Sequence, residues 1–349
     1  MPYSPMSSSQ TFHGRSHILA SKPLAPEFTV AIPTYNGEHR LPELLERLRS
    51  QVSTEHFRWE ILLVDNNSTD GTSELIRAYQ ADWPRKYPIR YLFEGRQGSA
   101  YARQRAVQEA QSELIGFLDD DNLPALDWVA AAYAFAQAHP RAGAYASQIH
   151  GDFEVAPPRN FKRIAGFLAI TERGSEPLLY EPRKKLLPPS AGLVVRRSVW
   201  GQHVPQTFNL RGRVGQSQGR AIAASEPGED LELLLHIQNA GWEIWYNPEM
   251  EMYHKIPRWR FERDYLLTMF RGIGLSRYYT RMLSVKPWQR PLATGAYILN
   301  DLRKIVWHSL KYRTVIHRDL VAACEMELFC YSLLSPFYHW KKILQNKRT

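Results

Sequence analysis

Three largely apolar runs, each followed by a polar turn, constrain the fold of this chain most strongly. They occupy residues 28–32, 60–64 and 114–118. A continuous apolar run with β-branched residues fits a strand buried on both faces, as in a parallel sheet. Between the first two runs, leucines recur at helical spacing on one face: Leu41, Leu44, Leu45 and Leu48. The pattern therefore predicts alternating strands and helices in an α/β fold with a parallel sheet.

The third run ends in three consecutive carboxylates, Asp119, Asp120 and Asp121. Adjacent acids at the end of a buried strand repel one another, and a divalent cation bound among them relieves that repulsion. Open parallel sheets bind ligands at the carboxyl ends of their strands. The triplet therefore predicts a Mg²⁺ or Mn²⁺ site that also binds a diphosphate. A solvated acidic turn that caps a helix is the alternative.

A set of short motifs follows in a fixed order along the chain. They read IPTYN at 32–36, VDNNSTDGT at 64–72, GSAYAR at 98–103, DDD at 119–121, GED at 228–230 and YH at 253–254. In this order they resemble the family 2 glycosyltransferases, a large inverting group with the GT-A fold. The resemblance implies a Rossmann-like mixed sheet flanked by helices, with a catalytic domain at 27–260. A disordered tail at 1–26 would precede it, and a basic, amphipathic helical extension at 261–349 would follow.

The same resemblance implies a role for individual residues. The donor, with a UDP-sugar favoured, would be bound by Pro33, Tyr35, Asn36, Asp65, Arg103, Asp119 and Asp120. The divalent metal would be held by Asp121, Asp119 and His254, the last expected just after a short strand. The sugar and acceptor cleft would include Ser190, Gly192 and Glu229, although relatives often have a more glycine-rich turn where Ser190 stands.

Asp230 is the expected catalytic base, because displacement with inversion needs one group to take the acceptor hydroxyl proton. It opens a predicted helix, which exposes the acid at a positive helix end. Ordinary helix capping is the alternative reading of Glu229 and Asp230. For His254 the alternative is a simply packed or solvated side chain, and for Arg103 it is a surface arginine.

Positive charge is concentrated near the end of the sequence. Residues 255–349 hold 18 Lys and Arg against 6 Asp and Glu, whereas the whole chain has a net charge of +9. Aromatic residues are also frequent there, and basic aromatic helices suit an anionic membrane surface, where a lipid-linked acceptor would lie. A packed helical subdomain with a solvated basic face is the alternative. Nucleic acid is not an expected partner, because no recognition motif accompanies the charge.

Two cysteines, Cys324 and Cys330, fit a reducing cytoplasm and give no disulfide framework. We find no uninterrupted apolar segment long enough for a membrane span. The expected location is therefore cytoplasmic, peripheral at the inner face of the plasma membrane. The glycine-rich stretch 205–228 is expected to act as a mobile lid or to form an ordinary surface loop.

The expected function is metal-dependent transfer of a sugar from a nucleoside-diphosphate sugar to a saccharide or lipid-linked hydroxyl, in cell-surface polysaccharide or glycolipid synthesis. A nucleotidyltransferase on a related sheet is one alternative. Such an enzyme would show a glycine-rich phosphate loop near the N-terminus, where this chain has the turn at 33–36. A non-catalytic sugar-nucleotide-binding or membrane-binding module is the other alternative.

Overall fold

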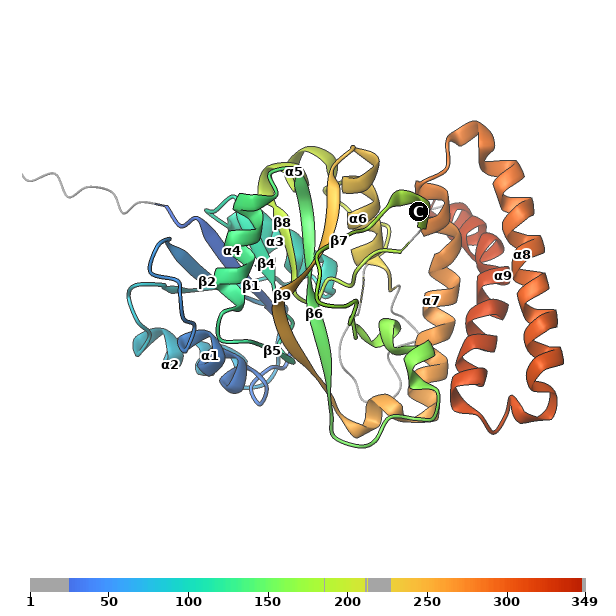
Figure 1. Ribbon diagram of the computed structural model, residues 1–349, viewed down its shortest axis with the longest axis horizontal. Helices are drawn as coiled ribbons and strands as arrows, with labels where there is room; N and C mark the ends of the chain where they lie inside the picture. The colour runs from blue at the N-terminus through green and yellow to red at the C-terminus, as the bar shows by residue number, and fades with distance from the viewer. Residues whose placement is uncertain (1–24, 185, 211, 213–226, 347–349) are drawn as a thin grey trace, which may run out of the picture.

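The computed structural model describes residues 25–184, 186–210, 212 and 227–346 (Figure 1). The strands in this part are β1 (Phe28–Thr34), β2 (Trp59–Asp65), β3 (Ile89–Phe93), β4 (Leu114–Phe117), β5 (Asn122–Pro124), β6 (Ala142–Phe153), β7 (Leu178–Leu179), β8 (Leu193–Arg196) and β9 (Glu243–Ile256). The α-helices are α1 (Leu41–Arg49), α2 (Thr72–Ala81), α3 (Ser99–Glu109), α4 (Trp128–Ala138), α5 (Arg197–His203), α6 (Glu229–Asn239), α7 (Arg263–Leu283), α8 (Arg290–Tyr312) and α9 (Leu320–Asn346). Nearly all of the predicted tail and most of the predicted lid lie outside the described residues.

The first half of the sheet is parallel, as the apolar runs predict. β1 pairs in parallel with both β2 and β4, and β2 pairs in parallel with β3. The register sets Thr34 beside Asp65, and residues 119–121 follow shortly after β4. The carboxyl ends of β1, β2 and β4 therefore meet at one edge of the sheet, where ligands bind in open α/β folds.

The second half makes the sheet mixed. The strand order is β3-β2-β1-β4-β8-β6-β9-β5, with β7 paired to β9. β8 runs antiparallel to both of its neighbours, whereas β6 and β9 are parallel to each other. β5 returns antiparallel along β9. The predicted mixed sheet flanked by helices is confirmed.

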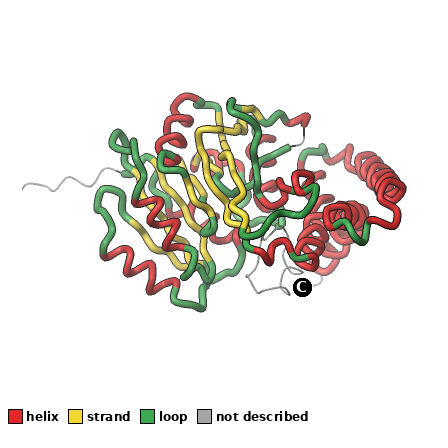
Figure 2. Tube along the Cα trace, turned by 60° about the horizontal axis from the view of Figure 1, so that its bottom comes forward, coloured by secondary structure: helices red, strands yellow, loops and turns green. Residues whose placement is uncertain are grey.

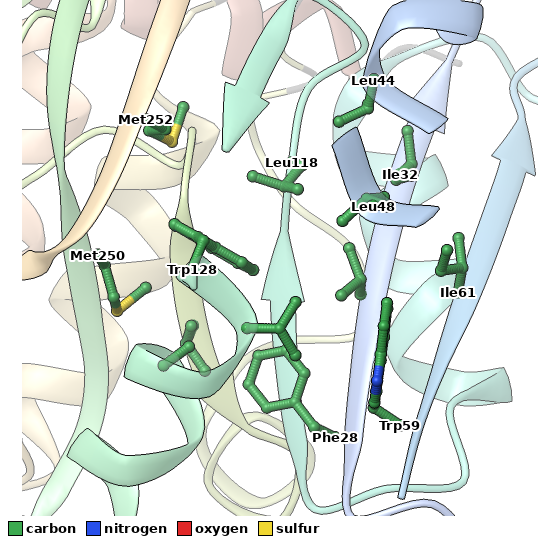
Figure 3. Packing of buried hydrophobic residues seen from close by; sticks show 14 of the residues in the cluster. Phe28, Ile32, Leu44, Leu48, Trp59, Ile61, Leu118, Trp128, Met250 and Met252 are labelled. Carbon is green, nitrogen blue, oxygen red and sulfur yellow. The ribbon is translucent and has the colours of Figure 1, made fainter. Parts of the chain in front are cut away.

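Helices cover both faces of the sheet, because side chains alternate along each strand. On β1, Phe28, Val30 and Ile32 belong to one apolar layer with α1, α2 and α4, and Ala31 belongs to the other with α3, α5 and α6. Figure 3 shows the first layer, in which the Phe28 and Trp128 rings meet edge to face, with centroids 6.3 Å apart. All four predicted leucines of α1 are fully buried there.

The C-terminal helices form a third apolar core beside the sheet (Figures 1 and 2). α7 and α9 pack together, and their buried side chains also contact residues 161–168 and Ile256 at the end of β9. The predicted extension therefore packs against the sheet and does not stand apart from it. The predicted boundary at 260/261 stays a prediction.

Helix α9 differs from the expectation that no segment is long enough to cross a membrane. Within the described residues, Leu320–Gln345 has the length and apolar composition of a span, and 44% of its most apolar stretch is buried inside the protein. A core helix of a soluble protein meets the same criteria, so length and composition alone are weak evidence. Glu325, Glu327, Ser332 and Ser335 interrupt the apolar residues of this helix, so a search for uninterrupted apolar segments misses it.

Candidate active site

A cavity of about 1200 Å³ opens over the ends of β1 and β4 and continues beside the start of α6. Ten of the predicted site residues line it: Pro33, Tyr35, Asn36, Arg103, Asp119, Asp120, Asp121, Ser190, Glu229 and Asp230. Segments that are up to about two hundred positions apart in the sequence thus meet at one edge of the sheet. Asp65, Gly192 and His254 are not among the lining residues.

Asp65 does not line the cavity, but its hydrogen bonds fix the turn and the strand beside it. Its carboxylate accepts hydrogen bonds from the Ser68 amide and the Tyr91 hydroxyl, both at 2.9 Å. Burial, together with Asp65, raises the pKa of Tyr91 to about 12, so that this hydroxyl stays a donor. The neighbouring Asn66 lines the cavity instead, and it is fixed by hydrogen bonds to Glu94, Arg96 and Gly98 in the loop between β3 and α3. The predicted role of Asp65 in donor binding stays a prediction.

Gly192 is explained by backbone geometry. Its φ of +61° lies in the left-handed region, and a Cβ there would approach the Ser147 Oγ to 2.4 Å. The Gly192 carbonyl accepts a hydrogen bond from that same hydroxyl at 2.8 Å. Only glycine fits this turn without strain. This turn places Ser190 and Ala191 in the lining of the cavity.

Each carboxylate of the triplet is paired with an arginine from a different part of the chain. The pairs are Asp119 with Arg103 at 3.0 Å, Asp120 with Arg40 at 2.8 Å, and Asp121 with Arg260 at 2.7 Å. Asp120 also accepts a hydrogen bond from the Thr34 hydroxyl at 2.6 Å. The repulsion that the sequence predicts within the triplet is therefore offset by guanidinium groups, and these six residues carry no net charge.

Arg40 and Arg260 are the site residues that sequence reasoning missed. Arg40 lies in the turn before α1, and Arg260 lies in a 3-10 turn, η5 (Arg258–Phe261). Neither has a motif or a spacing that would mark it, because each meets its acid only through tertiary packing. Arg260 is 2% exposed, which is rare for arginine unless it is paired.

His254 lies inside β9, opposite Asn122 of β5, and not beyond a short strand as predicted. Its Nδ1 is 3.0 Å from the Leu168 carbonyl, so Nδ1 carries the proton and Nε2 is left as an acceptor. Arg260 donates to that Nε2 at 2.8 Å and to Asp121 Oδ2 at 2.7 Å. His254 Nε2 and Asp121 Oδ2 are 3.5 Å apart, and the Arg260 guanidinium donates a hydrogen bond to each.

This pair of atoms suits a divalent cation. Histidines that bind metals usually donate their second ring N–H to a carbonyl, as His254 does to Leu168. Mg²⁺ commonly takes one or two protein ligands and completes its shell with phosphate and water. Within the described residues no three acidic, histidine or cysteine side chains gather as a ready-made metal cluster. A cation bound between Asp121 and His254 would therefore replace the Arg260 guanidinium and take its other ligands from a substrate or from water.

Asp230 lies in the first turn of α6, directly after Glu229, as predicted. Its carboxylate accepts a hydrogen bond from the Leu231 amide at 2.8 Å. Burial and the adjacent negative charge of Glu229 raise the pKa of Asp230 to about 6, against the attraction of Arg103. A carboxyl group with this pKa is ionised at neutral pH, yet it is more basic than an ordinary aspartate, which suits proton abstraction.

Arg103 joins the two ends of the cavity. Its guanidinium donates to Asp119 at 3.0 Å and to Glu229 at 3.1 Å, and the Ser99 hydroxyl also donates to Glu229, at 2.6 Å. The side chain is buried, so it is not the surface arginine of the alternative reading. One helix, α3, thereby holds the acidic triplet and the start of α6 at a fixed separation.

Comparisons with known proteins agree with this geometry. The sequence profile of glycosyl transferase family 2 matches residues 29–198, just under half of the chain. The uncharacterized glycosyltransferase YfnE of Bacillus subtilis (strain 168) is 36% identical over 102 residues, 29% of this chain and 25% of that protein. The putative teichuronic acid biosynthesis glycosyltransferase TuaG of the same organism is 33% identical over 97 residues, 28% of this chain and 36% of that protein. The matches thus span about a quarter to a third of the length of these curated relatives.

One solved structure resembles almost the whole chain. The mannosyltransferase PcManGT from Pyrobaculum calidifontis, solved in complex with GDP-Man and Mn²⁺, superposes with a TM-score of 0.54 at 17% identity. The superposition covers 90% of this chain and 88% of that one, and it supports the GT-A fold. The sequence match over residues 29–198 and the fold agree: this part of the chain is similar to glycosyl transferase family 2, in a GT-A fold.

Proposed function

We propose that the protein transfers a sugar from a nucleoside-diphosphate sugar to a hydroxyl acceptor with inversion at the anomeric carbon. One observation carries this proposal: the acidic triplet and the partly buried Asp230, whose pKa is raised to about 6, line the same cavity at the carboxyl edge of the sheet. The triplet lies where a diphosphate would bind. Asp230 lies where an acceptor hydroxyl would lose its proton.

The chemistry assigned to Asp230 is a single displacement. The acceptor oxygen forms a bond to the anomeric carbon as the bond from that carbon to the phosphate oxygen breaks. The hydroxyl proton passes to the Asp230 carboxylate, and the nucleoside diphosphate leaves with the electron pair of the broken bond. Attack from the side opposite the leaving group inverts the anomeric configuration, so no covalent sugar–enzyme intermediate is needed.

The donor end of the cavity supplies a wall and a set of charges. Tyr35 offers an aromatic face to a base, and Pro33 and Asn36 lie beside it at the end of β1. Asp119 is about one-third exposed, which leaves oxygen surface for a ribose hydroxyl. Arg103 is buried behind it and holds Asp119 in place through their ion pair. A UDP-sugar stays the favoured donor as a prediction.

We further propose that donor binding involves Mg²⁺ or Mn²⁺ held by Asp121 and His254. Each carboxylate of the triplet is paired with one arginine, so these pairs have no net positive charge with which to offset a bound diphosphate. When bound, a divalent cation would neutralise charge on the departing diphosphate as a Lewis acid. Arg260 would then leave the space between Asp121 and His254, but its positive charge would remain in the lining of the cavity.

Titrating nucleotide sugars with and without Mn²⁺, by calorimetry, tests donor and metal together. We expect metal-dependent binding of one nucleoside-diphosphate sugar to wild type and none to Asp121→Ala. Arg260→Met should bind Mn²⁺ alone roughly tenfold more tightly than wild type, because the competing cation is gone. Equal Mn²⁺ affinities in wild type, Asp121→Ala and Arg260→Met would remove the metal from this site. Failure of every nucleotide sugar to bind wild type would remove the donor.

The acceptor is proposed to be a saccharide or lipid-linked sugar of the cell surface, reached at an anionic membrane. The outer side of α8 carries an apolar row at heptad spacing, Leu292, Leu299 and Val306, which are 82%, 69% and 55% exposed. Trp288, just before α8, and Trp307, next to Val306 in the sequence, are also largely exposed. Such a row on a basic helix suits insertion at a lipid interface.

Sedimentation with phosphatidylglycerol vesicles tests the membrane proposal. We expect wild type to bind reversibly and to release as salt increases, because each basic residue contributes about 1 kcal/mol at most and is screened. Leu299→Glu with Val306→Glu should abolish binding. Val52→Glu, which places the same acid at an exposed apolar residue of the sheet domain, should not abolish it. A wild type that never sediments would refute the proposal.

A further inference from the structure

The cavity extends beyond the residues that resemble the family. Its lining includes Ser276, Arg277 and Arg281 from α7, and Tyr297, Asn300 and Lys304 from α8. Both helices lie outside the matched residues 29–198. The same hollow that contains Asp230 therefore has a second part, which is built by the C-terminal helices and carries three cationic side chains.

One of these three cations is neutralised within the protein. Arg281 donates two hydrogen bonds to Asp301 at 2.6 and 2.9 Å, and Ser332 donates a third to the same carboxylate at 3.0 Å. Asp301 is 1% exposed. The oxygens of this carboxylate are committed to Arg281 and Ser332, and the pair ties α7 and α8 to α9.

The other two cations have no such partner. Arg277 lies one turn before Arg281, and Lys304 lies one turn after Asp301, so both project toward the same region as that pair. Among the described residues, no acid forms an ion pair with either, and the Arg277 Nη1 is buried without a hydrogen-bond partner. Asp301 attracts Arg277 and Lys304 only at longer range, because Arg281 holds its oxygens.

The electrostatics agree with this arrangement. Burial, and then repulsion from Arg281, lower the pKa of Arg277 to about 10. Burial, and then repulsion from Arg277 ahead of the other cations nearby, lower the pKa of Lys304. Two half-buried cations that repel each other destabilise the folded chain, since a desolvated charge without a partner is costly. Lys304 Nζ lies 5.6 Å from the centre of the Phe329 ring, but this contact neutralises neither charge, whereas a bound anion would.

We propose that Arg277 and Lys304 form a subsite for a phosphate group carried by the acceptor. A guanidinium and an ammonium together offer several N–H donors to a tetrahedral anion, and the two positive charges match a phosphate monoester or diester. Ser276 and Tyr297 line the same part of the cavity. The subsite rests on the proposed function, because it positions the acceptor for the base at Asp230.

Binding of inorganic phosphate in the presence of saturating UDP tests the subsite, since UDP blocks the donor end. In calorimetry, Arg277→Gln with Lys304→Gln should weaken phosphate binding roughly tenfold or more relative to wild type. Lys311→Gln, which removes an exposed charge from the same helix α8, should leave it unchanged. Equal phosphate affinity in the wild type and the double variant would overturn the proposal.

A thermal melt separates a binding role from a structural one. Without phosphate, the double variant should melt at the same temperature as wild type or higher, because mutual repulsion is removed. With phosphate, wild type should gain stability and the double variant should not, since only a ligand bound to the native state stabilises it. A double variant that melts lower and still gains stability with phosphate would show that the two cations serve the fold.

Two further probes identify the source of the phosphate. Farnesyl phosphate should bind more tightly than inorganic phosphate, with the same dependence on Arg277 and Lys304, if the group is lipid-linked. Equal affinities would assign a soluble phosphorylated acceptor. Acetate competing as well as phosphate would overturn the phosphate assignment. UDP affinity, measured for every variant, reports the donor site separately, so loss of the subsite is not confused with failure of the proposed transferase.

Discussion

Asp230→Asn is expected to lower turnover by roughly 10²–10⁴-fold, because the amide keeps the shape of the side chain and cannot accept the acceptor proton. Donor affinity should stay within about twofold of wild type, since the base acts on the acceptor. Asp127→Asn is the matched control, because Asp127 also lies at the start of a helix, α4, but outside the cavity. Near-normal turnover in Asp230→Asn, with the donor still bound, would contradict the assignment.

The same residue predicts the pH profile of the reaction. Burial and Glu229 raise the pKa of Asp230 to about 6, and only its ionised form accepts a proton. Activity should therefore be lost as pH falls through about 6, and not near 4 as for an ordinary aspartate. Glu229→Gln removes the adjacent negative charge, so the loss should move to lower pH. A profile that is the same in Glu229→Gln and in wild type would contradict this coupling.

Arg103→Met is expected to reduce the free energy of unfolding by about 3 kcal/mol, because it leaves Glu229 and Asp119 without their cation. Both residue types favour helices about equally, so α3 itself should not be weakened. Arg103 also lowers the pKa of Asp230, and its loss should move the acid limb of the pH profile upward. Urea unfolding and the pH profile are the two measurements.

Arg105→Met supplies the control on the same helix. Arg105 pairs with Glu109 at 3.1 Å, and the side chains are 39% and 35% exposed. An exposed pair at this spacing contributes only about 0.3–0.5 kcal/mol. Similar small losses for Arg103→Met and Arg105→Met would show that the buried arginine does not organise the cavity.

The parallel half of the fold could be predicted from local sequence. Runs of apolar residues identified β1, β2 and β4, and leucine spacing identified α1, because each pattern depends only on neighbours along the chain. β9 was harder, since the polar residues Asn247, Glu249 and Glu251 interrupt its apolar residues. The reversal of β8 and β5 was not predictable, because pairing direction depends on contacts far apart in the sequence.

In the candidate site, too, the residues in local motifs could be predicted, whereas those that meet only through tertiary packing could not. The acids of the cavity stand in recognisable motifs, and the structure brings them together. Their cationic partners Arg40 and Arg260 stand in no motif, because a guanidinium on a long side chain can reach an acid from many positions. Arg277 and Lys304 were counted only as part of a basic C-terminal region, and the fold alone shows that they line the cavity.

The products released from the donor test the central claim most directly. The donor found by titration would be incubated with wild type and a hydroxyl acceptor, and the phosphate products separated by chromatography. We expect one nucleoside diphosphate for each glycoside formed, an inverted anomeric configuration by NMR, and neither product above background with Asp230→Asn. Release of pyrophosphate would identify a nucleotidyltransferase, and a glycoside that retains the donor's configuration would contradict displacement assisted by a single base.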